Sequence, residues 1–98
     1  MNMQQIMAQA QKMQKDIMAK KSEIDSMNFV GKSSWVEITF KGSKEISKVD
    51  IINDDALKIE NKEILCDMIF LAIKDALNQI DNKTEEKLGS YSKMNGRF

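Results

Sequence analysis

The first 27 residues contain neither glycine nor proline, and their apolar side chains recur at alternating heptad spacing. The apolar positions are Met3, Ile6, Ala10, Met13, Ile17, Ile24 and Met27, and only Lys20 interrupts the rhythm. This pattern predicts a helix about 37 Å long at about 1.5 Å per residue, whereas a compact chain of this size has a radius of gyration of about 13 Å. The chain therefore cannot cover the stripe from end to end. Either a second copy covers it or the helix projects as an arm.

The length and composition predict one small cytoplasmic domain. A chain of 98 residues buries a modest core, so a partner subunit would help its stability and we expect a homo-oligomer. Fifteen basic and fifteen acidic residues cancel, which argues against a uniformly basic nucleic-acid coat. No apolar run approaches the roughly 18 residues of a membrane span, and no signal-peptide pattern is present. The single cysteine, Cys66, excludes an internal disulfide and is expected in the core or in an interface.

The middle of the chain predicts a sheet over residues 28–52. Val36, Ile38 and Phe40 alternate with polar residues, as in a half-buried strand over 35–41. Turn-forming residues at 41–44 lead into a second β-branched run over 46–52, so a hairpin is expected, and 28–32 is a candidate preceding strand.

Helices are predicted over 54–88. A short helical turn is expected at 56–59, followed by a long helix from Ile64 whose apolar residues cover nearly its whole circumference. We expect that helix to contact the sheet on one side and another protomer on the other. Gly89–Phe98 is polar and is expected to form a mobile tail. The fold class is α+β.

The charges are segregated along the chain. In the first 22 residues four lysines face one acidic residue, Asp16, whereas over 45–67 acidic residues outnumber lysines by seven to three. The helix face opposite the stripe contains no carboxylate. It consists of Gln5, Ala8, Lys12, Lys15, Ala19, Ser22 and Ser26. Small side chains between lysines would let a phosphate backbone approach closely, but lysines also solvate the outer face of ordinary helices, and the pattern leaves both interpretations open.

Residues that support catalysis are scarce. The chain has no histidine, Cys66 has no base motif beside it, and no glycine-rich phosphate loop is present, so we expect neither an enzyme nor a cofactor. Asp50, Asp54 and Asp55 lack the spacing of a calcium loop, and turn or cap roles are favoured over metal binding. Trp35 either stacks on a base, packs under a helix or joins a dimer interface, and packing is favoured because large aromatics dominate cores and interfaces.

The order of the elements and several short motifs resemble one family along nearly the whole chain. The motifs are the opening run Met7–Gln14, then Val36, Ile38, Phe40 and Gly42, then Ile46, Val49, Asp50 and Ile51, and finally Glu63, Leu65, Ala72, Asp75 and Ala76. They are similar to those of the YbaB/EbfC nucleoid-associated proteins, small bacterial DNA-binding proteins with a helix, a three-stranded antiparallel sheet and a long final helix.

The resemblance implies a tweezer-like homodimer whose first helices project as arms and bind duplex DNA with limited sequence preference. It places DNA contacts on the first and last helices, at Lys12, Lys15, Lys20, Lys21, Lys74, Lys83 and Lys87. It also implies a location on the nucleoid and no small-molecule substrate, cofactor or membrane. The main hypothesis is thus a DNA-coating protein with an architectural or regulatory role. The alternative is a protein-interaction or holdase module that uses Met-rich helical surfaces.

Overall fold

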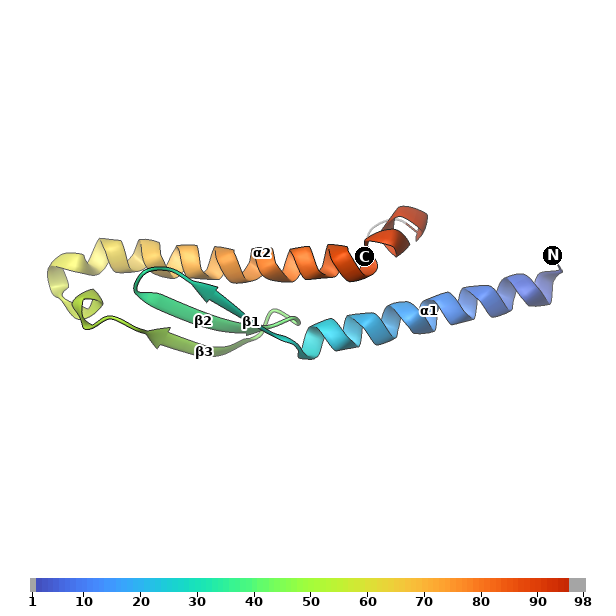
Figure 1. Ribbon diagram of the computed structural model, residues 1–98, viewed down its shortest axis with the longest axis horizontal. Helices are drawn as coiled ribbons and strands as arrows, with labels where there is room; N and C mark the ends of the chain where they lie inside the picture. Colours follow the sequence, from blue (N-terminus) through green and yellow to red (C-terminus); the bar gives the residue numbers. More distant parts are fainter. Residues whose placement is uncertain (1, 96–98) are drawn as a thin grey trace.

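The computed structural model describes residues 2–95 and has the predicted α+β architecture (Figure 1). A long helix precedes a three-stranded sheet, two short 3-10 turns follow, and a second long helix completes the described chain. The elements are α1 Met3–Ser26, β1 Asn28–Lys32, β2 Val36–Lys41, β3 Ile46–Ile51, η1 Asp54–Leu57, η2 Ile59–Asn61 and α2 Lys62–Asn95.

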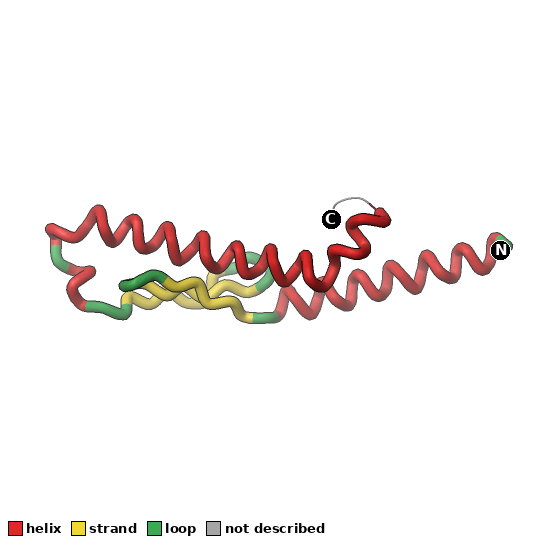
Figure 2. The backbone as a smooth tube through the Cα atoms, turned by 45° about the horizontal axis from the view of Figure 1, so that its top comes forward, coloured by secondary structure: helices red, strands yellow, loops and turns green. Residues whose placement is uncertain are grey.

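The molecule is elongated because α1 points away from the rest of the chain. Helix α2 lies lengthwise along one face of the sheet, and α1 extends beyond them at one end (Figures 1 and 2). The molecule measures 70 × 20 × 14 Å, with a radius of gyration of 19.2 Å. That radius clearly exceeds the roughly 13 Å of a compact domain of about 100 residues. Below, the sheet together with the part of α2 that covers it is called the body, and α1 is called the arm.

The sheet is antiparallel with strand order β1-β2-β3. Phe29 of β1 is opposite Phe40 of β2, and Gly31 is opposite Ile38, so these four residues share the face that α2 covers. The core is narrow. It consists of Ile24, Phe29, Val36, Ile38, Phe40, Ala72, Ala76, Ile80 and Leu88. Trp35 is half-buried against this cluster, as the packing interpretation predicts.

Close packing between α2 and the sheet requires Gly31. A methyl group at this position would meet the carbonyl oxygen of Ala72, and would lie 2.8 Å from the backbone nitrogen of Ala76. Ala72 and Ala76 are fully buried and have the small side chains that allow such an approach. Gly42 is similarly restricted, since a methyl group there would meet the carbonyl oxygen of Ile24 at the end of α1. These two close approaches fix α2 and α1, respectively, against the sheet.

Local hydrogen bonds determine where α1 begins. The side chain of Asn2 accepts a hydrogen bond from the Gln5 backbone N–H (2.9 Å), and the Gln5 side chain accepts one from the Asn2 N–H (3.4 Å). This capping box satisfies N–H groups that lack partners within the helix.

Helix α2 extends further than the sequence predicts. The expected helical segment ends at residue 88, whereas α2 continues to Asn95 and includes most of the expected tail; residues 96–98 lie outside the described range. The last turns bend away from the helix axis (Figure 2). The pair Gly89 and Ser90 lies in this part of α2, and such pairs are a recognised cause of helix bending.

Cys66 is exposed on α2, which excludes the first of its two predicted positions, the core of this chain; the second, an interface, stays a prediction. The helix is covered on one side only, and Phe70 and Leu71 near Cys66 are exposed as well. The expectation that α2 is buried nearly all round therefore fails for a single copy, and its second predicted contact, with another protomer, stays a prediction.

Candidate nucleic-acid interface

The body covers only the C-terminal part of the arm's apolar stripe. Ile24 is buried, and Ile17 and Met27 pack against the core. Met3 and Ile6, at the other end of the stripe, are 72% and 49% exposed. The prediction that the chain cannot cover its own stripe is confirmed, and α1 projects as an arm.

Lys20, the one interruption of the stripe, packs against the far end of α2. Its ammonium lies 4.9 Å from the centre of the Tyr91 ring, and its Nζ is 3.4 Å from the tyrosine hydroxyl oxygen. A cation over an aromatic face is an attractive arrangement, and the aliphatic part of lysine packs on apolar surface. The sequence gives no signal of this pair because the two residues are 71 positions apart.

Two of the seven predicted DNA-binding lysines lie on the outer face of the arm. Lys12 and Lys15 are exposed, and neither forms an ion pair within the described part of the chain. In the helical pattern they share the face that contains Ala8 and Ala19 and lacks carboxylates. Their ammonium groups are thus available to an external anion.

The other five predicted lysines have different surroundings. Lys87 pairs with Glu23 of α1 (3.3 Å), and Lys83 pairs with Glu86 within α2 (3.2 Å). Lys20 and Lys87 therefore both lie where the two helices meet. Lys74 is exposed 13 residues before Lys87, which places it about 20 Å away along the helix. The structure does not gather all seven lysines into one patch.

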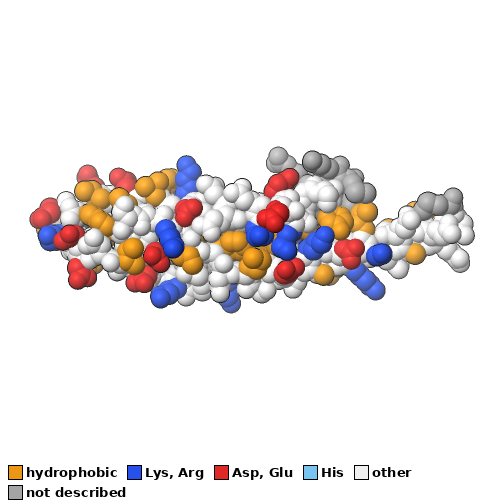
Figure 3. Space-filling view, in the orientation of Figure 1, with side chains coloured by type: hydrophobic (Ala, Val, Ile, Leu, Met, Phe, Trp, Pro, Cys, Tyr) orange, Lys and Arg blue, Asp and Glu red, His pale blue; other side chains and the backbone are white. Residues whose placement is uncertain are grey.

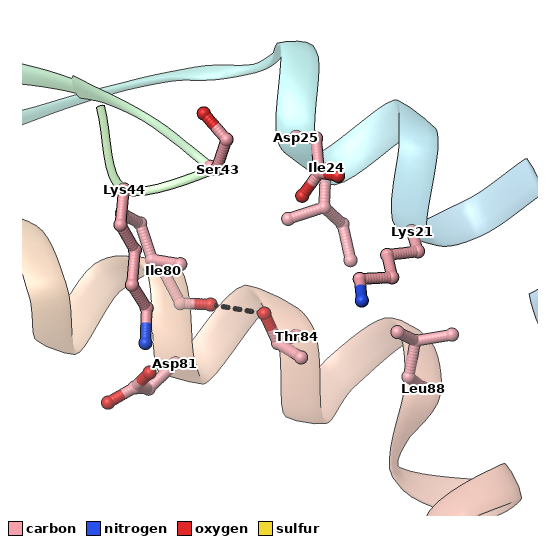
Figure 4. Close-up of a pocket in the computed structure, with 10 residues that line it drawn as sticks. Lys21, Ile24, Asp25, Ser43, Lys44, Ile80, Asp81, Thr84 and Leu88 are labelled. Atoms are coloured by element: carbon pink, nitrogen blue, oxygen red, sulfur yellow. Dashed lines mark hydrogen bonds between the residues drawn. The ribbon is translucent and has the colours of Figure 1, made fainter. Parts of the chain in front are cut away.

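Lys21 lines a cavity of about 530 Å³ between the end of α1, the β2–β3 turn and α2 (Figure 4). Lys44, Asp25 and Asp81 also line it, together with the apolar side chains of Ile24, Ile80 and Leu88. Lys44 has a positive φ of 73°, a conformation that is uncommon for residues other than glycine. Two lysines and two aspartates balance in charge, so the cavity as a whole does not favour a phosphate.

Acidic residues gather at the end of the molecule opposite the arm (Figure 3). Asp54 and Asp55 of η1, Glu60 of η2 and Glu63 at the start of α2 are all exposed. The charge segregation along the sequence thus becomes a separation along the long axis. An anionic polymer is favoured at the arm and disfavoured at the opposite end.

The two edges of the sheet differ, and only one is covered by side chains of α2. The backbone N–H of Lys32 in β1 donates to Asp75 Oδ2 (2.9 Å), and Gln79 Nε2 donates to the carbonyl oxygen of Val30 (2.8 Å). Gln79 Nε2 also donates to Asp75 Oδ2 (3.3 Å), which links the two capping side chains. At the opposite edge, β3 pairs with β2 on one side, and no described strand lies on its other side.

An apolar surface continues from β3 onto the neighbouring flank of α2. Val49 is 59% exposed and Ile46 54%, although the pairing of Val49 with Ile38 places it on the core side of the sheet. On α2, Phe70 is 65% exposed and borders a groove that Ile73 and Leu77 also line. We call Ile46, Val49, Ile51, Phe70 and Ile73 the β3–α2 surface. Such contiguous apolar surface is typical of a protein-interaction site.

Residues 2–95 offer neither a metal centre nor a membrane span. No group of three or more histidine, cysteine, aspartate or glutamate side chains within this range is placed to hold a metal ion. No described helix is long and apolar enough to cross a membrane.

Comparison with known proteins places the chain in one family. The model of the YbaB/EbfC DNA-binding family matches residues 1–95. The chain belongs to this family. A nucleoid-associated protein of Lactococcus lactis subsp. cremoris is 43% identical over 95 residues, which is 95% of each chain. A nucleoid-associated protein of Streptococcus pneumoniae is 43% identical over 94 residues, or 94% of each chain.

The fold recurs at low sequence identity in a solved structure. An uncharacterized protein of Helicobacter pylori superposes with a TM-score of 0.73 at 20% identity, over 88% of this chain and 91% of the other. The likeness to that structure concerns the fold alone. Membership of a YbaB/EbfC DNA-binding family confirms the resemblance seen in the sequence, and it agrees with the expectation that the chain is not an enzyme.

Proposed function

We propose that this YbaB/EbfC protein binds duplex DNA of the bacterial nucleoid as a homodimer, mainly through phosphates and with little sequence preference. The observation that carries the proposal is the outer face of the arm, where Lys12 and Lys15 are exposed and form no ion pair within the described residues. A lysine that contacts phosphate displaces condensed counterions but does not read a base edge. Binding of this kind suits an architectural or regulatory role.

The remaining lysines would contribute unequally. Lys21 and Lys74 are exposed, whereas Lys20 contacts Tyr91 and Lys87 pairs with Glu23. A phosphate at Lys87 would have to compete with the Glu23 carboxylate. We therefore rank Lys12 and Lys15 first among the proposed DNA-binding residues, and Lys87 and Lys83 last.

The β3–α2 surface is the proposed dimer interface. Its side chains lie beside the core yet are exposed or half-buried, because α2 covers β1 and β2 and leaves β3 open. Asp75 and Gln79 cap the β1 edge, so among the described residues the β3 edge is the one that stays open to an added chain. A second copy that covers β3 would bury apolar side chains on both chains, and two arms would then project from one body.

The salt dependence of binding tests the DNA proposal. Affinity for a random-sequence duplex is measured by fluorescence anisotropy across a range of salt concentrations. We expect the logarithm of the association constant to fall linearly with the logarithm of salt, with a slope of about −0.9 for each phosphate neutralised. A flat response, or no binding at low salt, would reject the proposal.

Variants of the arm locate the interface. Lys12→Gln with Lys15→Gln should weaken binding and make the salt slope shallower by about 0.9 for each phosphate that is no longer neutralised. The matched control is Lys58→Gln with Lys62→Gln, which removes the same charge at the acidic end and should change affinity less than twofold. Equal reductions of affinity in the two variants would show that net charge, and not the arm, determines binding.

The alternative of a protein-interaction or holdase module has one observation in its favour. Met7 and Met18 on the arm are 56% and 64% exposed, and methionine adapts to varied apolar partners. The Lys12 and Lys15 variant separates the two functions, since it should preserve capture of apolar clients while DNA binding falls.

A further inference from the structure

The end of the arm has a composition unlike the rest of the molecule. Residues 3–11, which we call the arm tip, contain no charged side chain; the first charged side chain in the sequence is Lys12. Met3, Ile6 and Met7 of the tip are all about half exposed or more. In the space-filling view the tip shows white and apolar surface without blue or red (Figure 3).

This chemistry supplies neither the charge that neutralises a duplex nor the charge that attracts an anionic membrane. Neutralising phosphates and releasing their counterions requires cationic side chains, and the tip has none. Helices that lie on anionic lipid surfaces are rich in lysine and arginine on their polar face, whereas the polar residues of the tip are glutamines. The DNA-binding proposal therefore leaves the function of the tip open.

We propose that the arm tip docks onto the arm tip of a second copy and so joins neighbouring dimers. The joining of dimers rests on the proposed function, but the contact between tips does not depend on DNA. The tip continues the heptad stripe of α1, which is the pattern with which helices pack against one another. Because the tip is uncharged, two identical tips meet without like-charge repulsion. Glutamine side chains both donate and accept hydrogen bonds, so they pair with themselves.

The direction of the arm favours an antiparallel arrangement of the two tips. Each arm projects from its body with the tip farthest away, so tips that join two bodies on opposite sides of the contact meet with their helices antiparallel (Figure 1). In an antiparallel overlap of residues 3–11, Lys12 and Lys15 of each copy lie outside the contact, at its two ends. The lysines thus stay available to DNA while the tips join two dimers.

The contact is small, so its strength depends on how many copies are held together. Nine helical residues span only about 13 Å, so two tips bury far less surface area than a standard protein interface does. Tips of free dimers should therefore associate weakly. Dimers bound along two duplexes present many tips at high local concentration, and multivalency then strengthens the link by orders of magnitude. The expected consequence is bridging of one duplex to another.

A bridging assay tests the proposal. A bead-bound duplex coated with protein is mixed with a labelled free duplex, and the captured label is measured. The test variant combines Met3→Gln, Ile6→Gln and Met7→Gln, which removes the apolar stripe without changing charge; glutamine is a good helix former, so α1 should persist. The control is Ala8→Gln, which adds an amide to the opposite face of the same helix.

We expect the triple variant to capture at least tenfold less labelled duplex, while its affinity for a single duplex stays within twofold of the unmodified protein. The Ala8→Gln control should behave as the unmodified protein. Undiminished capture by the triple variant would overturn the proposal. A matching fall in single-duplex affinity would also overturn it, because the tip would then belong to the DNA interface.

Cross-linking tests the same contact without DNA. In a Cys66→Ser background, Gln9→Cys places one thiol at the tip, and a short bismaleimide joins thiols that meet. The mass of the uncross-linked protein is measured first by light scattering. We expect covalent pairs that join two separate assemblies. The mass of the cross-linked products in native buffer should therefore exceed the mass of the uncross-linked protein. Covalent pairs with no increase in native mass would show that tips meet within one dimer, and absence of pairs would show that they do not meet; both results contradict the proposal.

The two measurements keep the proposals distinguishable. If the protein binds no duplex, the function proposed above fails, while cross-linking still decides whether tips associate. If duplex binding follows the expected salt dependence and tips do not cross-link between assemblies, only the tip proposal fails.

Discussion

Gly31 shows how one residue sets the spacing between helix and sheet. It lies in β1 directly beneath Ala72 and Ala76 of α2, and any side chain there would collide with helix backbone. In the sequence, Gly31 indicates only a boundary between elements, because local pattern does not identify the segment that packs on it, 41 residues away. For the same reason the sequence leaves Cys66 either in the core or in an interface, since a cysteine among apolar residues carries no information about which side of the helix is covered.

Replacement of Gly31 by alanine should destabilise the fold severely. The new methyl group must displace the α2 backbone, and we expect the free energy of unfolding to fall by about 3 kcal/mol or more. Chemical denaturation followed by circular dichroism measures this change. The control is Gly89→Ala: the atoms nearest to the new methyl belong to the flexible Glu85 side chain, and alanine favours the helix by up to about 1 kcal/mol. A Gly31→Ala protein as stable as the control would contradict the assigned packing of α2 on β1.

At the scale of elements, periodicity predicts the first helix and the central strand. The alternation over 35–41 corresponds to β2, and the heptad spacing corresponds to α1. The end of α2 is not predictable in this way, since the polar residues after Ile80 have no periodic signal although the backbone stays helical to Asn95. The difference between the two sheet edges is also hidden in the sequence, because it depends on Asp75 and Gln79 reaching β1 from another element.

Removal of the Gln79 side chain tests the capped edge. Gln79→Ala leaves the Val30 carbonyl without its donor, and an unsatisfied partly buried acceptor costs about 1 to 3 kcal/mol. We expect a decrease in that range by urea denaturation, together with faster hydrogen exchange in β1. Asn78→Ala, at the exposed neighbouring position, should change stability by less than about 0.5 kcal/mol. Similar values for the two variants would argue that the edge bond adds no stability.

A lysine on β3 tests the proposed dimer interface. Val49 is more than half exposed in a single chain, so Val49→Lys should leave the protomer folded while it places a charge in the centre of the β3–α2 surface. We expect the mass measured by light scattering to fall from that of a dimer to that of a monomer at micromolar concentration. Thr39→Lys adds the same charge on the opposite face of the sheet and should remain dimeric. A Val49→Lys protein that is still a dimer would place the interface elsewhere.

The whole molecule is electrically polarised, although its net charge is zero. The sequence predicts this segregation, but not that the acidic segment and the arm lie at opposite ends of a molecule 70 Å long. It also does not predict how the seven candidate lysines divide. Which lysines are free depends on partners such as Glu23 and Tyr91, and these come from elements that meet only in the folded chain. The sequence therefore assigns the candidate site to helices but cannot rank its lysines.

This polarity predicts that the acidic end has little influence on DNA binding at physiological salt. Screening limits electrostatic interaction between exposed charges to about 8 Å at about 0.15 M ionic strength, so a duplex on the arm should not sense Glu60 or Glu63 at the far end. Glu60→Gln with Glu63→Gln should therefore change duplex affinity less than twofold at that salt. At about 0.01 M the screening length grows to about 30 Å, and the same variant should bind more tightly than the unmodified protein. Anisotropy titrations at the two salt concentrations measure both effects. A several-fold gain in affinity at the higher salt would mean that DNA passes close to η2, which an arm-centred interface does not allow.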